Sequence, residues 1–434
     1  PKGKIIPETA EDFSTIIHYW LDQIEKGRDD VIIPNPEVMT TLEMFADDLN
    51  ATLASNFGYT SIYVGSAINK NQATYKTLYS VIKDCNMVIG NMDDTESDLA
   101  RTLLGTAWSI RSICYYNLMQ RYCEPYQPET AKETLGLPLV DDFDMEAKPA
   151  RANLKETAEF IEEGFRKALS YNVSNEDFIF TSSVTKAYFA RFFFWTQNWS
   201  NAITYAKEVL EKYPMLEADE YVEAINQKQA KAHNVIIRSF TMDDDIGTMS
   251  YATAQADIKS RPVDRNLVDL FAATDNDVRR RCNYDSKRIV NKIITTKFRS
   301  EELCLIIAEA HAHLNQETDA LGYLNQLRSK RITQNYIAYT IDNLPEVFQQ
   351  NIKTDATGIP LTKLMSAILC ERRKELFVEG DRWFELKRNG RPEFWVAAKG
   401  KKFITEKYLY TFPIPKADIR LFPDLLIQNP GYIE

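Results

Sequence analysis

The chain has 434 residues, of which 44% are hydrophobic and 12% aromatic, so it can bury a large core and is not a disordered or low-complexity sequence. Its formal net charge of −10 argues against a nucleic-acid partner, because binding a phosphate backbone needs a concentrated cationic surface. The sequence has no apolar run of the roughly 18 residues that a membrane-spanning helix requires.

Helical periodicity dominates the sequence from its beginning. In chain order, helices are expected at residues 8–25, 74–92, 98–122, 155–171, 184–197, 201–213, 300–314, 318–331 and 361–379. A short strand is expected at 235–238, where Val-Ile-Ile-Arg interrupts a polar stretch.

Two of the predicted hairpins look like tetratricopeptide repeats, which are helix-turn-helix units with small residues where the helices cross. Ala190 and Ala202 occupy the two small positions in the first hairpin, and Pro214 ends it. Ala308 and Ala320 repeat the same spacing in the second. Such units stack to bury a shared core, which predicts a scaffold.

Three other segments lack helical periodicity and are expected to be irregular: 56–73, 125–151 and 217–299. The fold class is therefore predicted to be mostly α, with a right-handed stack of tetratricopeptide-like hairpins supporting an irregular, loop-rich layer. Residues 74–214 and 300–390 would form the repeat scaffold, within a single domain that spans 1–434.

The most informative stretch runs from Cys370 to Gly390. Glu371, Glu375 and Glu379 are four residues apart, so on one helix they would share a face and repel. Cations must lie among them, and the candidates are Arg372, Arg373, Lys374 and Arg382. Because nearby arginines lower the pKa of a carboxyl group, a structural ion cluster is favoured over the acid and base of a glycosidase.

This stretch closely resembles the C-terminal signature of the SusD/RagB family, which are surface lipoproteins of Bacteroidetes that bind nutrients, usually glycans. The matching residues are Glu371, Arg372, Arg373, Glu375, Leu376, Glu379, Gly380, Arg382, Glu385, Leu386, Arg388 and Gly390. A second element, Phe412–Pro415 followed by Asp418-Ile419 and Gln428–Tyr432, is similar to the closing segment of that family.

The resemblance implies a SusD-like fold and a binding function without a cofactor. The protein would bind an oligosaccharide at the cell surface and deliver it to a SusC-like TonB-dependent transporter. The resemblance also implies a lipoprotein of the outer membrane, whose lipid anchor is expected upstream of Pro1 and is not present in this chain. Capture of a peptide or another non-sugar nutrient is the first alternative. A glycoside hydrolase and a cytosolic repeat adaptor are less favoured.

No catalytic or metal-binding residues are predicted. His311 and His313 are two residues apart on a predicted helix and so point to different faces. The acidic run 243–245 is interpreted as a solvated loop in preference to a calcium site. The six cysteines are expected to be mostly buried small hydrophobes, although a disulfide between Cys114 and Cys123 is left open.

Loop aromatics carry the binding hypothesis, because sugar rings stack on aromatic faces while polar side chains bond the hydroxyls. The six tryptophans are expected in the core: Trp20, Trp108, Trp195, Trp199, Trp383 and Trp395. The resemblance implies ligand contacts from two regions, 56–76 and 240–257. The predicted ligand-binding residues are Tyr59, Tyr63, Asn71, Tyr75, Phe240 and Tyr251.

Overall fold

The computed structural model describes residues 7–55, 65, 73–93, 97–142, 150–227, 232–239, 245–272, 274, 276–294, 297–398 and 400–432. The elements of the first half are α1 (Ala10–Glu25), α2 (Pro36–Phe45), η1 (Ala51–Leu53), α4 (Ala73–Asn91), α5 (Asp98–Tyr122), β1 (Leu135–Pro138), β2 (Arg151–Asn153), α6 (Leu154–Ser170), η4 (Glu176–Phe178), α7 (Ser182–Trp195) and α8 (Trp199–Lys212). The second half contains α9 (Ala218–Ile225), β3 (Val235–Arg238), α10 (Asp245–Lys259), α11 (Arg265–Val268), α12 (Val278–Asn283), β4 (Lys297–Arg299), α13 (Ser300–His313), α14 (Glu317–Ser329), α15 (Lys363–Glu375), α16 (Arg382–Arg388), β5 (Phe394–Ala398), β6 (Lys401–Thr405), η5 (Lys407–Tyr410) and α17 (Lys416–Leu421).

Polar caps set where several helices begin. The Thr9 hydroxyl accepts a hydrogen bond from the Asp12 N–H, and the Asp12 carboxylate accepts one from the Thr9 N–H, so a capping box starts α1. Asn153 and Glu156 form the same reciprocal pair at the start of α6. The side chain of Ser97 caps α5, which spans the predicted 98–122.

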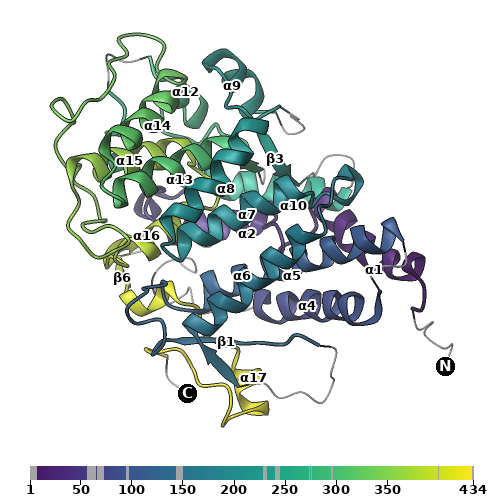
Figure 1. Cartoon of the computed structure of the whole chain (residues 1–434). Coiled ribbons are helices and arrows are strands. Elements are labelled where there is room, and N and C mark those ends of the chain that lie inside the picture. Colours follow the sequence, from purple (N-terminus) through teal and green to yellow (C-terminus); the bar gives the residue numbers. More distant parts are fainter. Residues whose placement is uncertain are drawn as a thin grey trace.

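The predicted repeat hairpins are present, and the mostly α fold class is confirmed. Helix α7 packs against α8 and α13 against α14, while α13 also packs against α8 and α15. Ala190, Ala202, Ala308 and Ala320 are all fully buried, as the close approach of the helix backbones requires. Figure 1 shows these hairpins in the upper left of the view, with α4, α5 and α6 below them.

The main hydrophobic core draws residues from both ends of the described chain, from Ala10 to Ile414. The ring of Trp383 is fully buried and stacks on Tyr410, with 4.4 Å between ring centroids. All six cysteines are free thiols, which answers the open question of a disulfide between Cys114 and Cys123. The C-terminal segment therefore belongs to the core and joins the helical scaffold to the groove described below.

In the described residues, the sheets are three antiparallel pairs, β1 with β2, β3 with β4, and β5 with β6. Strand β3 matches the predicted strand at 235–238. Residues 135–138, within a segment expected to be irregular, form β1.

Two other sequence predictions need correction. Helix α15 ends at Glu375, not at residue 379, because Val378 and Gly380 adopt positive φ angles of 50° and 78° that a helix cannot contain. The segment 217–299 is more helical than predicted. Its helix α10 packs on α2, and Ala254 and Ile258 belong to the same buried cluster as Met39 of α2. These apolar residues form a stripe too narrow to stand out in a polar sequence.

Candidate functional site

The three signature glutamates lie in a buried ion cluster, as predicted, but their main partners come from elsewhere in the chain. The carboxylate oxygens of Glu375 lie 3.2 Å from Arg279 Nη1, 2.9 Å from Arg299 Nη1 and 3.1 Å from Arg331 Nε. Burial alone would raise the pKa of Glu375, but these arginines hold it well below its usual range. Glu371 pairs with Arg279 and Lys374. The cluster is therefore structural.

Glu379 lies beyond the helix and is held differently from the other two glutamates. Arg299 Nε and Nη2 each donate to one of its carboxylate oxygens at 3.0 Å, and Lys292 Nζ lies 3.5 Å away. Burial alone would raise the pKa of Glu379, but the two cations lower it. Sequence spacing alone could not identify these partners.

The arginines of the signature point away from those glutamates, contrary to prediction. Arg372 binds Asp381, with hydrogen bonds of 3.0 and 2.8 Å. The other two signature arginines bind carboxylates in the loop after α2: Arg373 Nε donates to Asp48 at 2.6 Å, and Arg382 donates to Asp47 at 2.7 and 3.0 Å. The signature thereby fixes the position of residues 47–48.

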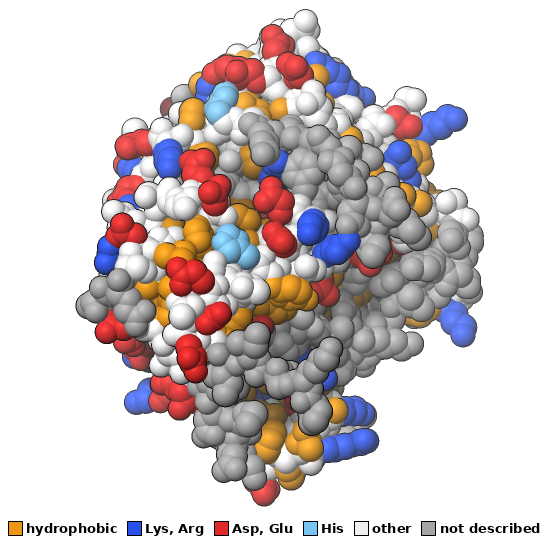
Figure 2. Space-filling model, turned by 90° about the vertical axis from the view of Figure 1, so that its right-hand side faces the viewer, with side chains coloured by type: hydrophobic (Ala, Val, Ile, Leu, Met, Phe, Trp, Pro, Cys, Tyr) orange, Lys and Arg blue, Asp and Glu red, His pale blue; other side chains and the backbone are white. Residues whose placement is uncertain are grey.

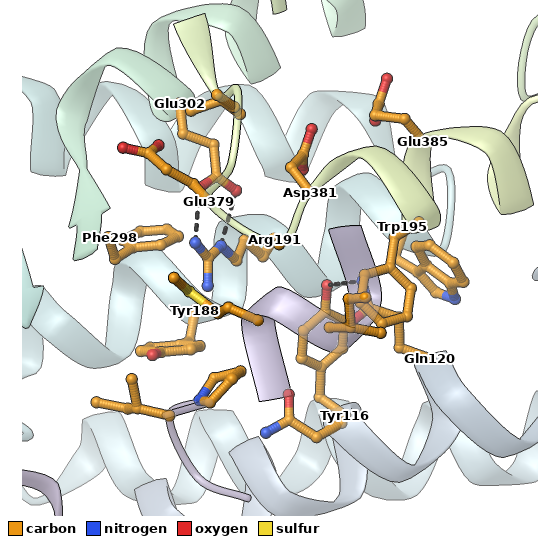
Figure 3. A pocket seen from close by; sticks show the side chains of 18 of the residues that line it. Tyr116, Gln120, Tyr188, Arg191, Trp195, Phe298, Glu302, Glu379, Asp381 and Glu385 are labelled. Atoms are coloured by element: carbon orange, nitrogen blue, oxygen red, sulfur yellow. Dashed lines mark hydrogen bonds and ion pairs between the residues drawn. The ribbon is translucent and has the colours of Figure 1, made fainter. Parts of the chain in front are cut away.

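A small cavity of about 110 Å³ lies beside this signature segment. Figure 3 shows Arg191 directed at Glu302, beside the rings of Tyr188 and Phe298. Arg191 donates to both oxygens of Glu302 at 2.7 and 2.6 Å, and the two rings stack 5.3 Å apart. Because ligand pockets usually measure about 300–1,000 Å³, this cavity is too small for an oligosaccharide.

A larger groove of about 690 Å³ opens on the surface next to residues 47–48. Four chain segments form its walls: 46–52, 264–266, 349–353 and 393–397. They include the start of α11, the loop before α15 and strand β5. The groove thus gathers segments separated by more than 300 residues, and its size fits a sugar ligand.

One wall of the groove is built from carboxylates and amides in fixed positions. Asn351 Nδ2 donates to Asp47 Oδ2 at 3.0 Å, next to the Arg382 bonds to the same carboxylate. Asn50 Nδ2 donates to Asp264 Oδ2 at 3.1 Å. Preorganised side chains of this kind bind hydroxyl groups without a large ordering cost.

Further amides line the groove near α11 and the loop before α15. The Asn266 Nδ2 group donates to the backbone oxygen of Gln349 at 2.8 Å, and Asn266 Oδ1 accepts from Arg373 Nη1 at 2.6 Å. The Gln350 side chain is buried, and its Nε2 has no hydrogen-bond partner among the described residues. That Nε2 is a candidate donor for a ligand hydroxyl, because a buried donor without a partner is costly.

The apolar wall of the groove is strand β5, which carries an exposed tryptophan. The Trp395 side chain is 60% exposed, although a core position was predicted, because it lies on the outer face of a two-stranded hairpin. Its cross-strand partner Ile404 is 46% exposed, and Lys402 Nζ lies 4.9 Å from the Trp395 ring centroid. An indole face at the edge of a polar groove can stack on a sugar ring.

Gly65 approaches the same hairpin. A Cβ atom added at Gly65 would lie 2.8 Å from the Ile404 carbonyl oxygen, and its φ of +54° favours glycine. Ile404 pairs with Trp395 across the hairpin. One residue of the predicted ligand-contact region 56–76 therefore touches the strand that faces the groove's tryptophan.

The carboxylates of the groove are all engaged in structural bonds. Asp47 binds Arg382, Asp264 caps α11 by accepting from the Asn266 N–H, and Glu393 accepts from the Lys407 N–H. Glycoside hydrolysis requires one carboxyl group with a raised pKa and a second carboxylate facing it across the sugar. No group of three or more side chains suited to hold a metal ion occurs in the part of the chain that the structure describes.

The predicted site residues fall into two groups. Tyr75 lies in α4 and Tyr251 in α10, and both are buried, so they are helical residues and not the loop aromatics of the prediction. Tyr75 packs edge-on against Tyr122, with ring centroids 5.0 Å apart, and the Tyr251 hydroxyl bonds Gln255. A sugar could stack on either ring only if the covering side chains moved.

The remaining predicted contacts lie outside the described residues: Tyr59, Tyr63, Asn71 and Phe240. They stay predictions. The predicted site did not include Trp395 or the amides at 349–351, which line the groove. A usable signal for a hairpin was present, since the apolar run Phe394–Ala398 is followed by Gly400 and a second short segment, Lys401–Thr405.

The surface seen in Figure 2 carries mixed charge. Among the side chains drawn in colour there, Lys and Arg lie singly or in small groups, with acidic side chains between them. On this face, then, no extended cationic surface is visible among the coloured residues. Of the helices described, none combines the length and the apolar character needed to cross a bilayer.

Two family models match the chain. Residues 282–432 match the model described as "SusD family", and residues 12–194 match the model described as "Starch-binding associating with outer membrane". The first includes the signature segment and the β5–β6 hairpin, and the second runs from the first turn of α1 to the last turn of α7. No curated protein sequence matches the chain.

Solved structures with the same fold cover nearly the whole chain. A SusD superfamily protein from Bacteroides thetaiotaomicron has a TM-score of 0.74 and 18% identity, with 97% of this chain and 100% of that chain covered. A SusD-like carbohydrate binding protein from Bacteroides vulgatus has a TM-score of 0.72, 19% identity and coverages of 96% and 98%. A protein described as "Laminarin binding SusD-like protein" has a TM-score of 0.63, 17% identity and coverages of 98% and 99%.

Proposed function

The chain belongs to the SusD/RagB family, and on that premise we propose that it is a non-catalytic protein that binds an oligosaccharide in the groove beside Trp395. We treat residues 1–434 as one binding domain, in which the helical hairpins support the groove.

One observation carries the proposal: an exposed indole faces a groove whose other walls are amides and engaged carboxylates. The Trp395 side chain is 60% exposed, and with its cross-strand partner Ile404 it offers an apolar surface that a ligand can cover. The groove's polar groups suit the hydroxyls of a neutral sugar ring. The carbohydrate binding named for two of the structural neighbours agrees with this ligand class.

We propose delivery as the second part of the function. The protein would hold the oligosaccharide at the outer face of the outer membrane, anchored by an N-terminal lipid, and pass it to a SusC-like TonB-dependent transporter. Support comes from the family description, which places starch-binding relatives at the outer membrane. Co-purification of the full-length protein with a transporter from the same membrane would test this part, and a protein that fractionates alone would contradict it.

Catalysis is not part of the proposal, because every carboxylate lining the groove already holds an arginine, an amide or a backbone N–H. Incubation with a bound oligosaccharide should leave that oligosaccharide intact, as judged by chromatography of the products. Turnover that persists through repurification and disappears on a single carboxylate substitution would identify an enzyme.

A glycan array with the purified protein tests the ligand class. Oligosaccharides of one or a few related types should bind, and Trp395→Ala should remove that signal. The matched control is Trp108→Ala, because Trp108 lies outside this groove. Binding of peptides with no response from any glycan would favour the alternative of a non-sugar nutrient.

A further inference from the structure

A second groove, of about 700 Å³, lies at the other side of α11 and is strongly cationic. Its lining residues include five cations and two carboxylates. These are Arg265, Arg280, Arg281, Lys287, Arg288, Asp277 and Asp285. A concentration of positive charge of this kind stands out on a chain whose formal net charge is −10.

The two carboxylates of this groove are already occupied by structural bonds. Asp277 receives two hydrogen bonds from the buried Arg279, at 2.9 and 2.7 Å. Asp285 Oδ1 accepts from the N–H groups of Lys287 and Ile289, at 2.8 and 2.9 Å, and so closes the turn that presents Lys287. Among the described residues, neither carboxylate makes an ion pair with an exposed cation of the groove.

Four of the five cations of this groove face solvent. Arg265, Arg280, Arg281 and Lys287 are exposed, and none of them makes an ion pair with another described residue. Arg288 is half-buried, and its Nη1 donates to the backbone oxygen of Val263 at 3.1 Å. Guanidinium groups bind carboxylate and sulfate groups with two parallel hydrogen bonds, so three exposed arginines in one groove suit an anionic ligand.

The cationic groove adjoins the groove of Trp395 through the short helix α11. Asp264 and Asn266 line the Trp395 groove, whereas Arg265 and Val268 line the cationic groove. Neighbouring residues of one helical turn thus face the two grooves. A single oligosaccharide could therefore occupy both, with one ring on Trp395 and a charged ring against Arg265.

We propose that the cationic groove binds the carboxylate or sulfate groups of an acidic oligosaccharide, which makes the ligand of this protein an anionic glycan. The inference rests on the proposed function, because it assumes that the ligand is an oligosaccharide. What it adds is that this oligosaccharide is negatively charged. Phosphates of a lipid surface and of a nucleic acid share the anionic chemistry. A glycan is favoured because the groove continues the one that carries the exposed indole.

The test compares two charge-reversal variants of the full chain. In the first, Arg280→Glu and Arg281→Glu change two exposed residues of the cationic groove. In the matched control, Lys416→Glu and Arg420→Glu change two exposed residues of α17 and alter the net charge equally. Helix α12, which carries Arg280 and Arg281, lies at the opposite end of the molecule from α17 (Figure 1).

The probes are an oligogalacturonate, a sulfated heparin-derived oligosaccharide and a neutral laminari-oligosaccharide of equal length. Calorimetry at low and high ionic strength should show that at least one anionic probe binds and that its affinity falls as the salt concentration rises. Its affinity should fall roughly tenfold or more in Arg280→Glu/Arg281→Glu, as expected for lost charge-assisted bonds, and stay unchanged in the α17 control. Arg265→Glu, on a different element, should weaken the same probe.

Three results would overturn the inference. The first is binding of the neutral probe alone, which would leave the proposed function standing. The second is an equal loss of affinity in the α17 control, which would indicate a general electrostatic attraction of the probe without a specific site. The third is tighter binding of anionic phospholipid vesicles or single-stranded DNA than of either acidic glycan. Absence of binding by every oligosaccharide, with wild-type circular dichroism, would instead contradict the proposed function itself.

Discussion

Arg382 donates two hydrogen bonds to Asp47, which lies 335 positions earlier in the chain. The arginine belongs to the signature segment, and the aspartate lies in the wall of the Trp395 groove. Asp47 also receives a hydrogen bond from Asn351, another residue of that wall. The ion pair thus connects the helical scaffold directly to the candidate ligand-binding groove.

Arg382→Ala should therefore damage both stability and binding. The substitution leaves Asp47 buried without its main cation, which should lower the free energy of unfolding by about 3 kcal/mol. Ligand affinity should fall in the protein that remains folded, because Asp47 and Asn351 lose a fixed position. Urea denaturation and calorimetry at a temperature below the unfolding transition measure the two effects. Wild-type affinity in a destabilised Arg382→Ala protein would show that the ion pair does not position the groove.

Arg372→Ala and Glu379→Ala should affect stability alone. Each removes one partner of a buried ion pair away from the groove, so each should lower the free energy of unfolding by about 3 kcal/mol. Affinity of the folded protein should not change. The control is Lys363→Ala, which removes only an exposed pair with Glu346 and should have little effect on stability. A stable Glu379→Ala protein without binding would place Glu379 in the site.

The free energy of unfolding should depend on the ionisation of Glu375 at acidic pH. Burial alone would raise its pKa, but the arginines around it hold that pKa well below the ordinary value of 4.5. Because the folded-state pKa lies below the unfolded one, Glu375 contributes stability above about pH 4.5 and the contribution is lost as the pH falls through the folded value. Glu375→Gln should be less stable at neutral pH and should lose less stability on acidification. Urea denaturation of both proteins at a series of acidic to neutral pH values would measure this pH dependence. An identical change in the free energy of unfolding with pH in the two proteins would contradict the role assigned to Glu375.

Local sequence information predicted the scaffold well. The 98–122 helix has its predicted bounds because Ser97 caps its start and its apolar residues run throughout. Ala190, Ala202 and their counterparts in the second hairpin indicated the helix crossings through their spacing alone, and all four are buried there. Periodicity and caps depend on residues a few positions apart, so they are visible in a single sequence.

The candidate groove could not be predicted in the same way, because it is assembled from distant segments. Arg279 binds Glu375 across 96 positions, and no local pattern identifies that pair. The exposure of Trp395 depends on which face of a two-stranded hairpin packs on the protein, and both faces carry apolar residues. The family resemblance supplied the region around Gly65, but it did not supply the indole beside it.

The predicted ligand contacts Tyr59 and Tyr63 can be tested in the same binding assay as the residues of the Trp395 groove. Removing one ring that stacks on a sugar should cost about 1–3 kcal/mol of affinity without changing the melting temperature. Tyr221→Phe is a suitable control, because it removes only a hydroxyl from a fully buried ring of α9. Calorimetry with the best ligand from the glycan array measures the loss. Wild-type affinity in Tyr59→Ala/Tyr63→Ala would remove both residues from the site.

The most direct test of the account is calorimetric titration of wild-type and Trp395→Ala proteins with the oligosaccharide selected by the glycan array. An indole that anchors a sugar ring should contribute about 2 kcal/mol or more, so the dissociation constant should rise by a factor of roughly 30 while circular dichroism and the melting temperature stay unchanged. An unchanged dissociation constant in a folded Trp395→Ala protein would contradict the assignment of this groove as the ligand-binding site.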